Sequence, residues 1–280
     1  MTALAQALED PVDARRRIEA HDVWYHTIDV APGVTTPGWF DTRHIVDLLP
    51  WPDVRGKRCL DVGTFDGFFA FELERRGAAE VIAIDIEDHR LWDWPAEARP
   101  GVIEDRDLSF LGPPKGDGWR LVAELTGSRA TWQALSIYDL NPADVGMFDV
   151  VVCGSLLLHL RDPVRALEAV RTVCGGWFLS SEQIELDLSL FSRRQSLFRI
   201  DGSGQTCQWW LPNAAGHERL LWAGGFSVEA RSAPYVEHFH RHPRPEPTLR
   251  NRLQHTAMRL LTGDPEPGVL HRGLLARPRL

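Results

Sequence analysis

A short apolar run, a glycine turn and an amphipathic stretch follow one another over residues 58–76, with the sequence RCLDVGTFDGFFAFELERR. The apolar run is typical of a strand buried on both faces, and the apolar residues after Gly67 repeat at helical spacing. A second apolar run over residues 80–86, EVIAIDI, predicts another buried strand. The pattern therefore predicts a strand, a tight turn, a helix and a second strand, around which the rest of the chain is organised.

Apolar runs and amphipathic stretches keep alternating along the chain, which predicts a doubly wound α/β sheet. Further strands are expected at about residues 131–137, 148–153, 177–181, 226–230 and 268–277. Helices are expected at about residues 41–49, 119–126, 163–174, 212–223 and 248–261, with one or two short helices broken at Pro11 before them. Gly175 and Gly176 are expected to end the helix that begins at Pro163.

One main domain is expected over residues 51–280, with irregular insertions at about residues 88–118 and 184–210. Long irregular loops in compact domains are often lids or binding loops. A preceding segment, residues 1–50, combines short helices with a stretch rich in aromatic residues, Pro and Gly. This segment is expected to be either a lid over a cleft or a simple packing arm.

Asp85 ends the second strand, 22 residues after Gly63 (85 − 63 = 22). A carboxylate at about this distance is placed to accept hydrogen bonds from ribose hydroxyls. The spacing is not that of a dinucleotide site, because position 65 is Phe65 where such a site needs glycine. The pattern DxGxxxG instead resembles motif I of class I S-adenosylmethionine (SAM) methyltransferases, although the middle glycine is missing. An ordinary strand, turn and helix with incidental glycines is the alternative.

The resemblance implies SAM as the cofactor, and an acid at the first motif position suits its cationic amino group and sulfonium. The loop after the third strand contacts adenine in SAM enzymes. The expected cofactor-binding residues are Asp61, Gly63, Thr64, Phe65, Gly67, Asp85, Ile86, Ser136, Ile137, Cys153 and Gly154.

Methyl transfer needs a base only where the acceptor must lose a proton. His159 is the first candidate, because it follows the fourth strand and the pKa of histidine lies near neutrality. A helix-capping or scaffold role is its alternative, and His26 is the second candidate. Candidate acceptor-binding residues are Trp24, Glu182, Gln183, Arg199, Gln208, Trp209 and Trp210. Core packing is the alternative for Trp209 and Trp210. His238, His240 and His242 alternate without a partnering cysteine or acid cluster in the sequence, so we expect no metal.

The net charge of −8 argues against a dominant nucleic-acid surface. Residues 239–280 nevertheless carry eight arginines against three acids, which is typical of a solvated basic tail. We find no apolar run long enough for a membrane span and no apolar N-terminal run typical of a secretory signal. Four scattered cysteines indicate reduced, buried thiols. Together these features predict a cytoplasmic protein without membrane contact, and they leave its oligomeric state open.

Three blocks look like those of the tRNA wobble-uridine (mo5U34) methyltransferase/carboxymethyltransferase family: DVGTFDGFFAFELERRGA with VIAIDI, FDVVVCGSLLLHLRDPVRAL, and WWLPNAAGHERLLWAGGF. The terminal RGLLARP is similar to that family's last strand. The resemblance spans roughly residues 24–277. It implies a Rossmann-like, seven-stranded class I methyltransferase sheet, mostly parallel, with an antiparallel last strand.

Two departures from this family concern the recognition of a carboxylated cofactor. Leu158 replaces the tyrosine of the tRNA enzymes, and neither Lys57 nor Lys115 falls in the segment that carries the family's lysine. We therefore expect ordinary SAM and methyl transfer to O or N of a small molecule of specialised (secondary) metabolism. Modification of wobble uridine in tRNA is one alternative, and a non-catalytic SAM-binding or interaction protein is another.

Overall fold

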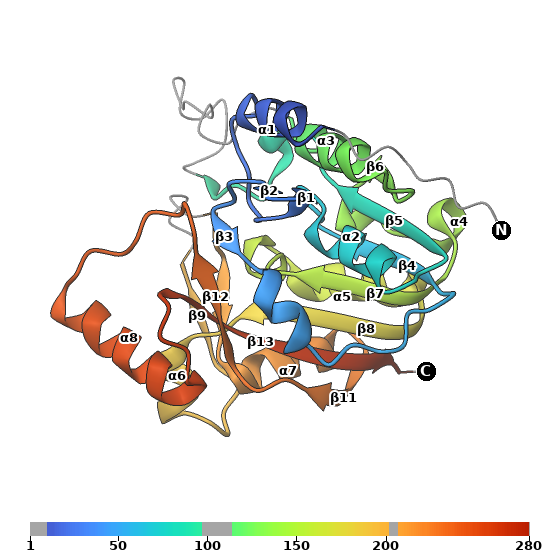
Figure 1. The fold of residues 1–280 in the computed structure, drawn as a ribbon. Helices are drawn as coiled ribbons and strands as arrows, with labels where there is room; N and C mark the ends of the chain where they lie inside the picture. Colours follow the sequence, from blue (N-terminus) through green and yellow to red (C-terminus); the bar gives the residue numbers. More distant parts are fainter. Residues whose placement is uncertain (1–9, 97–113, 202–206, 280) are drawn as a thin grey trace.

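A central twisted sheet organises the molecule, and the computed structural model describes residues 10–96, 114–201 and 207–279 (Figure 1). Its nine strands follow the order β3-β12-β13-β8-β7-β4-β5-β6, with β11 also paired to β13. The parallel part consists of β4 (Arg58–Val62), β5 (Glu80–Asp85), β6 (Thr131–Ala134), β7 (Phe148–Gly154) and β8 (Cys174–Gln183). The strand, turn, helix and strand expected around residues 58–86 are confirmed.

The last strand, β13 (Gly268–Pro278), runs antiparallel to β8, as the family resemblance implies. Its other edge pairs with two consecutive strands, β11 (Phe226–Arg231) and β12 (Tyr235–Phe239). Only the first of these was expected, because YVEHF in β12 runs directly into the Pro- and Arg-rich stretch. At the far edge, β12 pairs with β3 (Phe40–Asp41) of the N-terminal segment.

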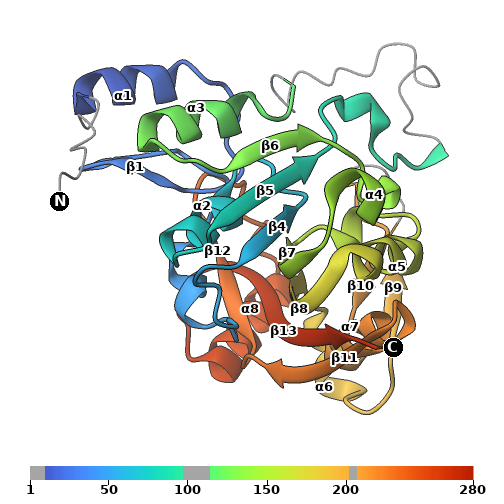
Figure 2. The ribbon, with the colours of Figure 1, turned by 90° about the vertical axis from the view of Figure 1, so that its right-hand side faces the viewer.

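Helices cover both faces of the sheet (Figure 2). One face buries a cluster that includes apolar residues of α1 (Pro11–Glu19), α2 (Phe68–Arg75) and α3 (Asp117–Thr126). The other buries a cluster with residues of α4 (Pro142–Val145), α5 (Pro163–Val173) and α7 (Ala214–Ala223). Apolar burial on both faces explains why the central strands read as nearly continuous apolar runs.

The N-terminal segment differs in detail from the expectation. Helix α1 begins at Pro11, which agrees with the break expected there, since Asp10 caps the helix and proline is tolerated at the first position. The short strands β1 (Asp29–Ala31) and β2 (Val34–Thr35) form a hairpin, and the helix expected over residues 41–49 is the 3-10 helix η1 (Arg43–Asp47). Residues 1–9 of the expected lid lie outside the described residues.

The expected insertions are only partly described. The first contains η2 (His89–Leu91), and its residues 97–113 lie outside the described residues. The second is less irregular than expected, because it holds α6 (Leu186–Phe191), β9 (Phe198–Ile200) and the start of β10 (Trp210–Pro212). Two further 3-10 helices follow strands, η5 (Ile137–Asp139) and η6 (Leu157–His159). Helix α8 (Leu249–Thr262) confirms the helix expected at residues 248–261.

Gly175 and Gly176 correct one expectation, because they lie inside β8 and do not form a turn. Helix α5 passes directly into this strand at Cys174. A Cβ atom on Gly176 would lie 2.3 Å from the carbonyl oxygen of Asp149, so glycine here permits close approach of two backbones. The longer strand also places Glu182 and Gln183 at its end, where residues just beyond the strand were expected.

Candidate active site

The glycine turn after β4 has the backbone conformation that its sequence predicts. Gly63 and Gly67 have φ values of 73° and 101°, in the region that favours glycine. A Cβ atom on Gly63 would lie 2.7 Å from the side chain of Leu156, so the turn also requires a residue without a side chain here. Gly67 caps α2. The result is a bare stretch of backbone at the carboxyl ends of β4 and β5, where open α/β sheets bind ligands.

Asp61 lies next to this turn with an unsatisfied oxygen. Its side chain is buried, and its Oδ2 atom has no hydrogen-bond partner among the described residues. Burial raises the pKa of this carboxyl group to about 6. A buried carboxylate with a free oxygen favours a cationic ligand group, since an unpartnered buried acceptor is costly.

Asp85, at the end of β5, is already fully engaged. The ammonium group of Lys115 donates to both carboxylate oxygens, at 2.9 and 3.1 Å. The backbone N–H groups of Phe65 and Ile86 also donate to this carboxylate, at 2.9 and 2.8 Å. The aromatic rings of Phe65 and Trp92 lie 4.7 and 4.8 Å from the ammonium. A ligand hydroxyl must therefore share Asp85 with Lys115 or displace it.

Sequence reasoning assigned Lys115 no role in the site. It lies in the first expected insertion, 30 residues after Asp85. Together with Phe65 and Asp66 it lines a small cavity that also contacts His21 and His89. The only signal in the sequence was the rarity of lysine, of which the chain has two.

His26, the second base candidate, is buried and paired with Asp66. Its Nδ1 atom contacts Asp66 Oδ1, and the backbone N–H groups of Tyr25 and His26 donate to Asp66 Oδ2 at 2.8 and 2.9 Å. Burial lowers the pKa of His26, but the charge and hydrogen bond of Asp66 outweigh it and the pKa is raised. The contact fastens the N-terminal segment to the glycine turn, and it favours a charged, positioning His26 over a neutral base.

His159, the first base candidate, lies in η6 directly after β7. Its Nδ1 atom is 2.9 Å from the carbonyl oxygen of Cys207. A carbonyl only accepts, so Nδ1 carries the proton and Nε2 keeps its lone pair. Burial lowers the pKa of His159, and the nearby charge of Lys115 lowers it further. The geometry thus gives a neutral imidazole with a fixed tautomer, which is the form that a general base requires.

The tryptophans around His159 hold the adjoining loops together. The backbone N–H of Trp209 donates to the carbonyl of Leu158 at 2.7 Å, and its indole Nε1 donates to the backbone carbonyl of Asp93 at 2.6 Å. Trp210 donates through Nε1 to the backbone carbonyl of Arg161 at 3.1 Å. Gln208 lies between Cys207 and Trp209 in the sequence and is half-buried. These contacts place Trp209 and Trp210 near the base candidate, and an acceptor pocket lined by them stays a prediction.

Glu182, the last residue but one of β8, is a buried acid. Its Oε1 atom accepts the N–H groups of Leu156 and Leu157 at 3.3 and 3.2 Å, and Oε2 has no partner in the described part of the chain. Burial raises the pKa of Glu182 to about 8. The side chain is therefore neutral near pH 7 and can donate a hydrogen bond.

Three residues next to Glu182 were missed by sequence reasoning. Nε2 of His271 lies 3.0 Å from the hydroxyl of Ser155 and 3.4 Å from Oε2 of Glu237. Ser155 has a φ of 51°, which is uncommon for a residue with a side chain. The three residues come from a loop, β12 and β13, so only the sheet topology brings them together. They form a buried polar cluster beside the carboxyl ends of β7 and β8.

Several other expected site residues have structural roles. Trp24 is buried in the core and donates through Nε1 to Ile18 at 3.2 Å, so it does not line a pocket as expected. Arg199 lies half-exposed in β9 and pairs with Glu185 at 2.5 Å, so its charge is already occupied. The remaining expected residues lie at strand ends, in loops or, for Ile137, at the start of η5: Thr64, Ser136, Ile137, Cys153, Gly154 and Gln183. Among these, Ser136 caps η5 and Gln183 is the last residue of β8.

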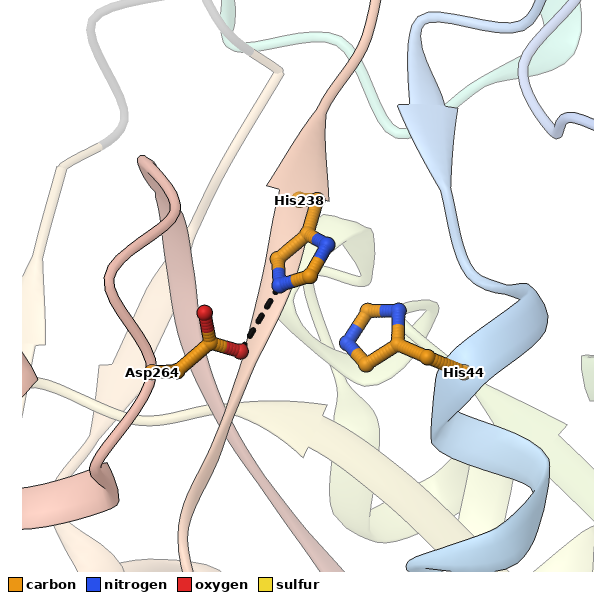
Figure 3. Close-up of side chains that lie close together, drawn as sticks. All are labelled: His44, His238 and Asp264. Atoms are coloured by element: carbon orange, nitrogen blue, oxygen red, sulfur yellow. Dashed lines mark hydrogen bonds and ion pairs between the residues drawn. The ribbon is translucent and has the colours of Figure 1, made fainter.

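Of the alternating histidines, His238 takes part in a three-residue cluster (Figure 3). Its Nε2 atom lies 2.7 Å from Asp264 Oδ2, and its ring stacks on that of His44 with centroids 3.8 Å apart and planes 12° apart. Nε2 of His44 donates to the carbonyl of Val236 at 2.8 Å. Lone pairs in two nearly parallel, stacked rings do not converge on one point, so this arrangement is a hydrogen bond and a ring stack. We assign it no metal.

The geometry therefore presents a buried acid with a free oxygen, a glycine turn and a second acid at adjacent strand ends. Residues 41–255 match the family model of the methyltransferase domain, and the chain belongs to this family. The expected domain family and α/β fold are confirmed: the chain carries a methyltransferase domain on a sheet with a parallel core, although this sheet has nine strands where the resemblance implied seven. The free oxygen of Asp61, the turn at Gly63 and the carboxylate of Asp85 fit a ligand with a cationic end and ribose hydroxyls, as SAM has.

Individual relatives are distant. The chain is 29% identical over 138 residues to a ubiquinone biosynthesis O-methyltransferase of Neisseria meningitidis, covering 47% of this chain and 48% of the relative. It is 28% identical over 152 residues to a tRNA U34 carboxymethyltransferase of Campylobacter hominis, covering 52% and 44%. The chain thus spans about half the length of these curated relatives. The N-terminal domain of EvdMO1, solved with S-adenosylhomocysteine (SAH) bound, superposes with a TM-score of 0.55 at 15% identity, over 97% of this chain and 98% of that one.

Proposed function

We propose that the protein transfers the methyl group of SAM to an oxygen or nitrogen of a small-molecule acceptor, with His159 as the general base. The observation that carries this proposal is the fixed tautomer of His159, whose unprotonated Nε2 belongs to a neutral, half-buried imidazole. Such a base is required where the acceptor atom loses a proton. Asp61, Gly63 and Asp85 would hold SAM, which supplies an activated methyl group on a sulfonium.

The chain's own groups supply positioning and proton transfer. Nε2 of His159 takes the proton from the acceptor, and the carbonyl of Cys207 stabilises the imidazolium that results. Glu182, neutral near pH 7, offers its unpartnered Oε2 to a polar acceptor group. Trp209, beside His159, excludes water from the proton transfer. Holding the reacting atoms in place accounts for most of the catalysis, because the sulfonium is already a good leaving group.

A small acceptor is favoured over RNA by the polar lining of the site. Glu182, Glu237 and His271 are all buried, so they can meet only a group that enters the protein. Tyr25 and His26 bring the N-terminal segment against the glycine turn, as a lid would. The O-methyltransferase relative is consistent with this proposal.

Modification of tRNA is the second candidate, supported by the similarity to tRNA U34 carboxymethyltransferases. The deciding experiment supplies the purified chain with SAM or with carboxy-SAM, and offers either bulk tRNA or a panel of phenols, catechols and amines. We expect methyl transfer to a member of the panel and none to tRNA. Carboxymethyl or methyl transfer to tRNA with no turnover of the panel would replace the small-molecule proposal.

His159→Asn tests the base within the same assay. Asparagine keeps a side-chain N–H that can reach the Cys207 carbonyl but has no basic nitrogen. We expect kcat to fall about 10²- to 10⁴-fold, with SAH affinity within about twofold of the parent protein. An unchanged kcat would assign His159 to the scaffold. His242→Asn is the matched control, because it makes the same change at a histidine whose Nδ1 also donates to a backbone carbonyl, that of Pro243, and which has no proposed role in the reaction.

A further inference from the structure

Helix α8 is unusual in having no buried residue although it contains four leucines and a methionine. It lies at the edge of the molecule, outside the layers that cover the sheet (Figure 1). Its inner side packs through Ala257 and Met258 on a small cluster that includes Leu186 and Leu190 of α6. The helix is therefore anchored along one side and open to solvent along the other.

The open side carries an apolar stripe. Leu249, Leu253 and Leu260 are 76%, 61% and 82% exposed. They are spaced by four and seven residues, which places them on one face of an α-helix. Exposing three leucines on one face of a helix to water is unfavourable, and a large exposed apolar surface on a protein marks an interaction site.

The same helix carries only positive charge. Residues 249–262 contain Arg250, Arg252 and Arg259 and no acid, although the protein as a whole has a net charge of −8. The three arginines are exposed. Arg250 lies 3.9 Å from Asp187 of α6, at the limit of an ion pair. Four residues beyond Asp187, Phe191 ends α6 with an 88% exposed ring.

We propose that this face of α8, defined by Leu249, Leu253, Leu260, Arg252 and Arg259, docks on the surface of a membrane that carries anionic lipids. Arginines attract the lipid headgroups while leucines enter the boundary of the acyl chains, which is the pattern of a helix lying in the membrane interface. Bare polyanions such as RNA satisfy the arginines but leave the leucines in water. The contact is interfacial, since no helix among the described residues is long and apolar enough to cross a membrane.

The inference goes beyond the proposed methyl transfer, and its test needs no substrate. The full chain is centrifuged with vesicles of phosphatidylcholine alone or with phosphatidylglycerol added. We expect co-sedimentation with the anionic vesicles only, weakening as salt rises. Leu253→Ser with Leu260→Ser should lower the partition coefficient about tenfold per leucine. Arg252→Gln with Arg259→Gln should lower it about fivefold per arginine.

Matched controls come from exposed residues on other elements. Val12→Ser removes a 74% exposed apolar side chain from α1, and Arg55→Gln removes an exposed arginine ahead of β4. Both should leave vesicle binding unchanged. Equal losses in the controls, or equal binding to both kinds of vesicle, would overturn the proposal.

A direct probe of insertion is also available, because all four native cysteines are buried. Leu253→Cys can be labelled with an environment-sensitive dye, whose emission should shift to the blue when anionic vesicles are added. No shift together with a leucine-dependent dimer in sedimentation equilibrium would show that a second copy covers α8 instead. Arginine-dependent tRNA binding that ignores the leucine substitutions, without vesicle binding, would equally sink the membrane proposal.

Discussion

Lys115 and Asp85 form a buried ion pair in the site where ribose hydroxyls are expected to bind. The side chains are only 9% and 3% exposed, and both carboxylate oxygens accept from the ammonium group. A lysine of the chain itself therefore occupies the acid that is expected to bind ribose. This ion pair leads to an unusual expectation, namely that removing the lysine strengthens ligand binding.

Lys115→Met should tighten the binding of SAH. The substitution removes the cation that competes for Asp85 and leaves the acid free for ribose hydroxyls. We expect a gain of about 5- to 20-fold, on the order of 1–2 kcal/mol, measured by calorimetry. Lys57→Met is the control, because Lys57 is the only other lysine and is exposed. Weaker binding by Lys115→Met would mean that Lys115 contacts the ligand.

Asp85→Ala separates stability from affinity. Removing the acid leaves the ammonium of Lys115 buried without its partner, which should cost about 3–5 kcal/mol of unfolding free energy. Adding Lys115→Met should recover most of this stability, as urea unfolding would measure. Affinity for SAH should stay reduced in both variants, because the ribose acceptor is gone. If the double variant bound SAH as the parent does, Asp85 would not be the ribose ligand.

Glu182 should make the protein less stable as the pH rises. Its folded-state pKa is about 8 against an ordinary 4.5. Between these values the folded chain holds a proton that the unfolded chain releases, so the unfolding free energy falls with rising pH, by up to about 1.4 kcal/mol per pH unit. Glu182→Gln should flatten this slope. Urea unfolding between pH 6.5 and 8 tests it above the titration of Asp61, whose pKa is about 6. An equal slope in the variant would contradict the burial of a neutral acid.

The pH profile of kcat should rise with a midpoint below 6.5, because burial lowers the pKa of His159. Below that midpoint Nε2 is protonated and cannot accept the acceptor's proton. Initial rates at saturating SAM and acceptor would give the profile, and His159→Asn should lack this limb. If kcat of the parent and of the variant rose with pH in the same way, the titrating group would not be His159.

Gly63→Ala should destabilise the protein by more than backbone strain alone. Gly33 has nearly the same φ, 71° against 73°, and no atom of the described residues lies within 4 Å of the place that an alanine methyl group would take there. Gly33→Ala therefore measures strain, expected at about 1 kcal/mol, while Gly63→Ala adds the contact with Leu156. Thermal unfolding compares the two, and Leu156→Ala should relieve part of the Gly63→Ala loss. Equal losses at both glycines would show that Leu156 moves aside freely.

The order of strands and helices could be predicted because each element repeats a local period. The glycine turn, Asp61 and Asp85 were found for the same reason, since strand, turn and acid follow one another in the sequence. Lys115, Glu237 and His271 could not be found this way. They reach the site from an insertion and from β12 and β13, and only tertiary pairing places them there. Trp24 misled for the converse reason: an aromatic residue next to a motif looks the same whether it lines a pocket or fills a core.

Some partners of the N-terminal segment are translated much later than the segment itself. Thr27 Oγ1 lies 2.9 Å from Nδ1 of His240, a partner 213 residues later in the chain. Strand β3 likewise pairs with β12. During synthesis Thr27 and β3 can already pair with each other, because the hydroxyl of Thr27 also donates to the carbonyl of Phe40 at 3.0 Å. Their contacts with β12 and His240 can form only after the residues from 235 onward have been translated, so the outer edge of this segment stays unpaired until then.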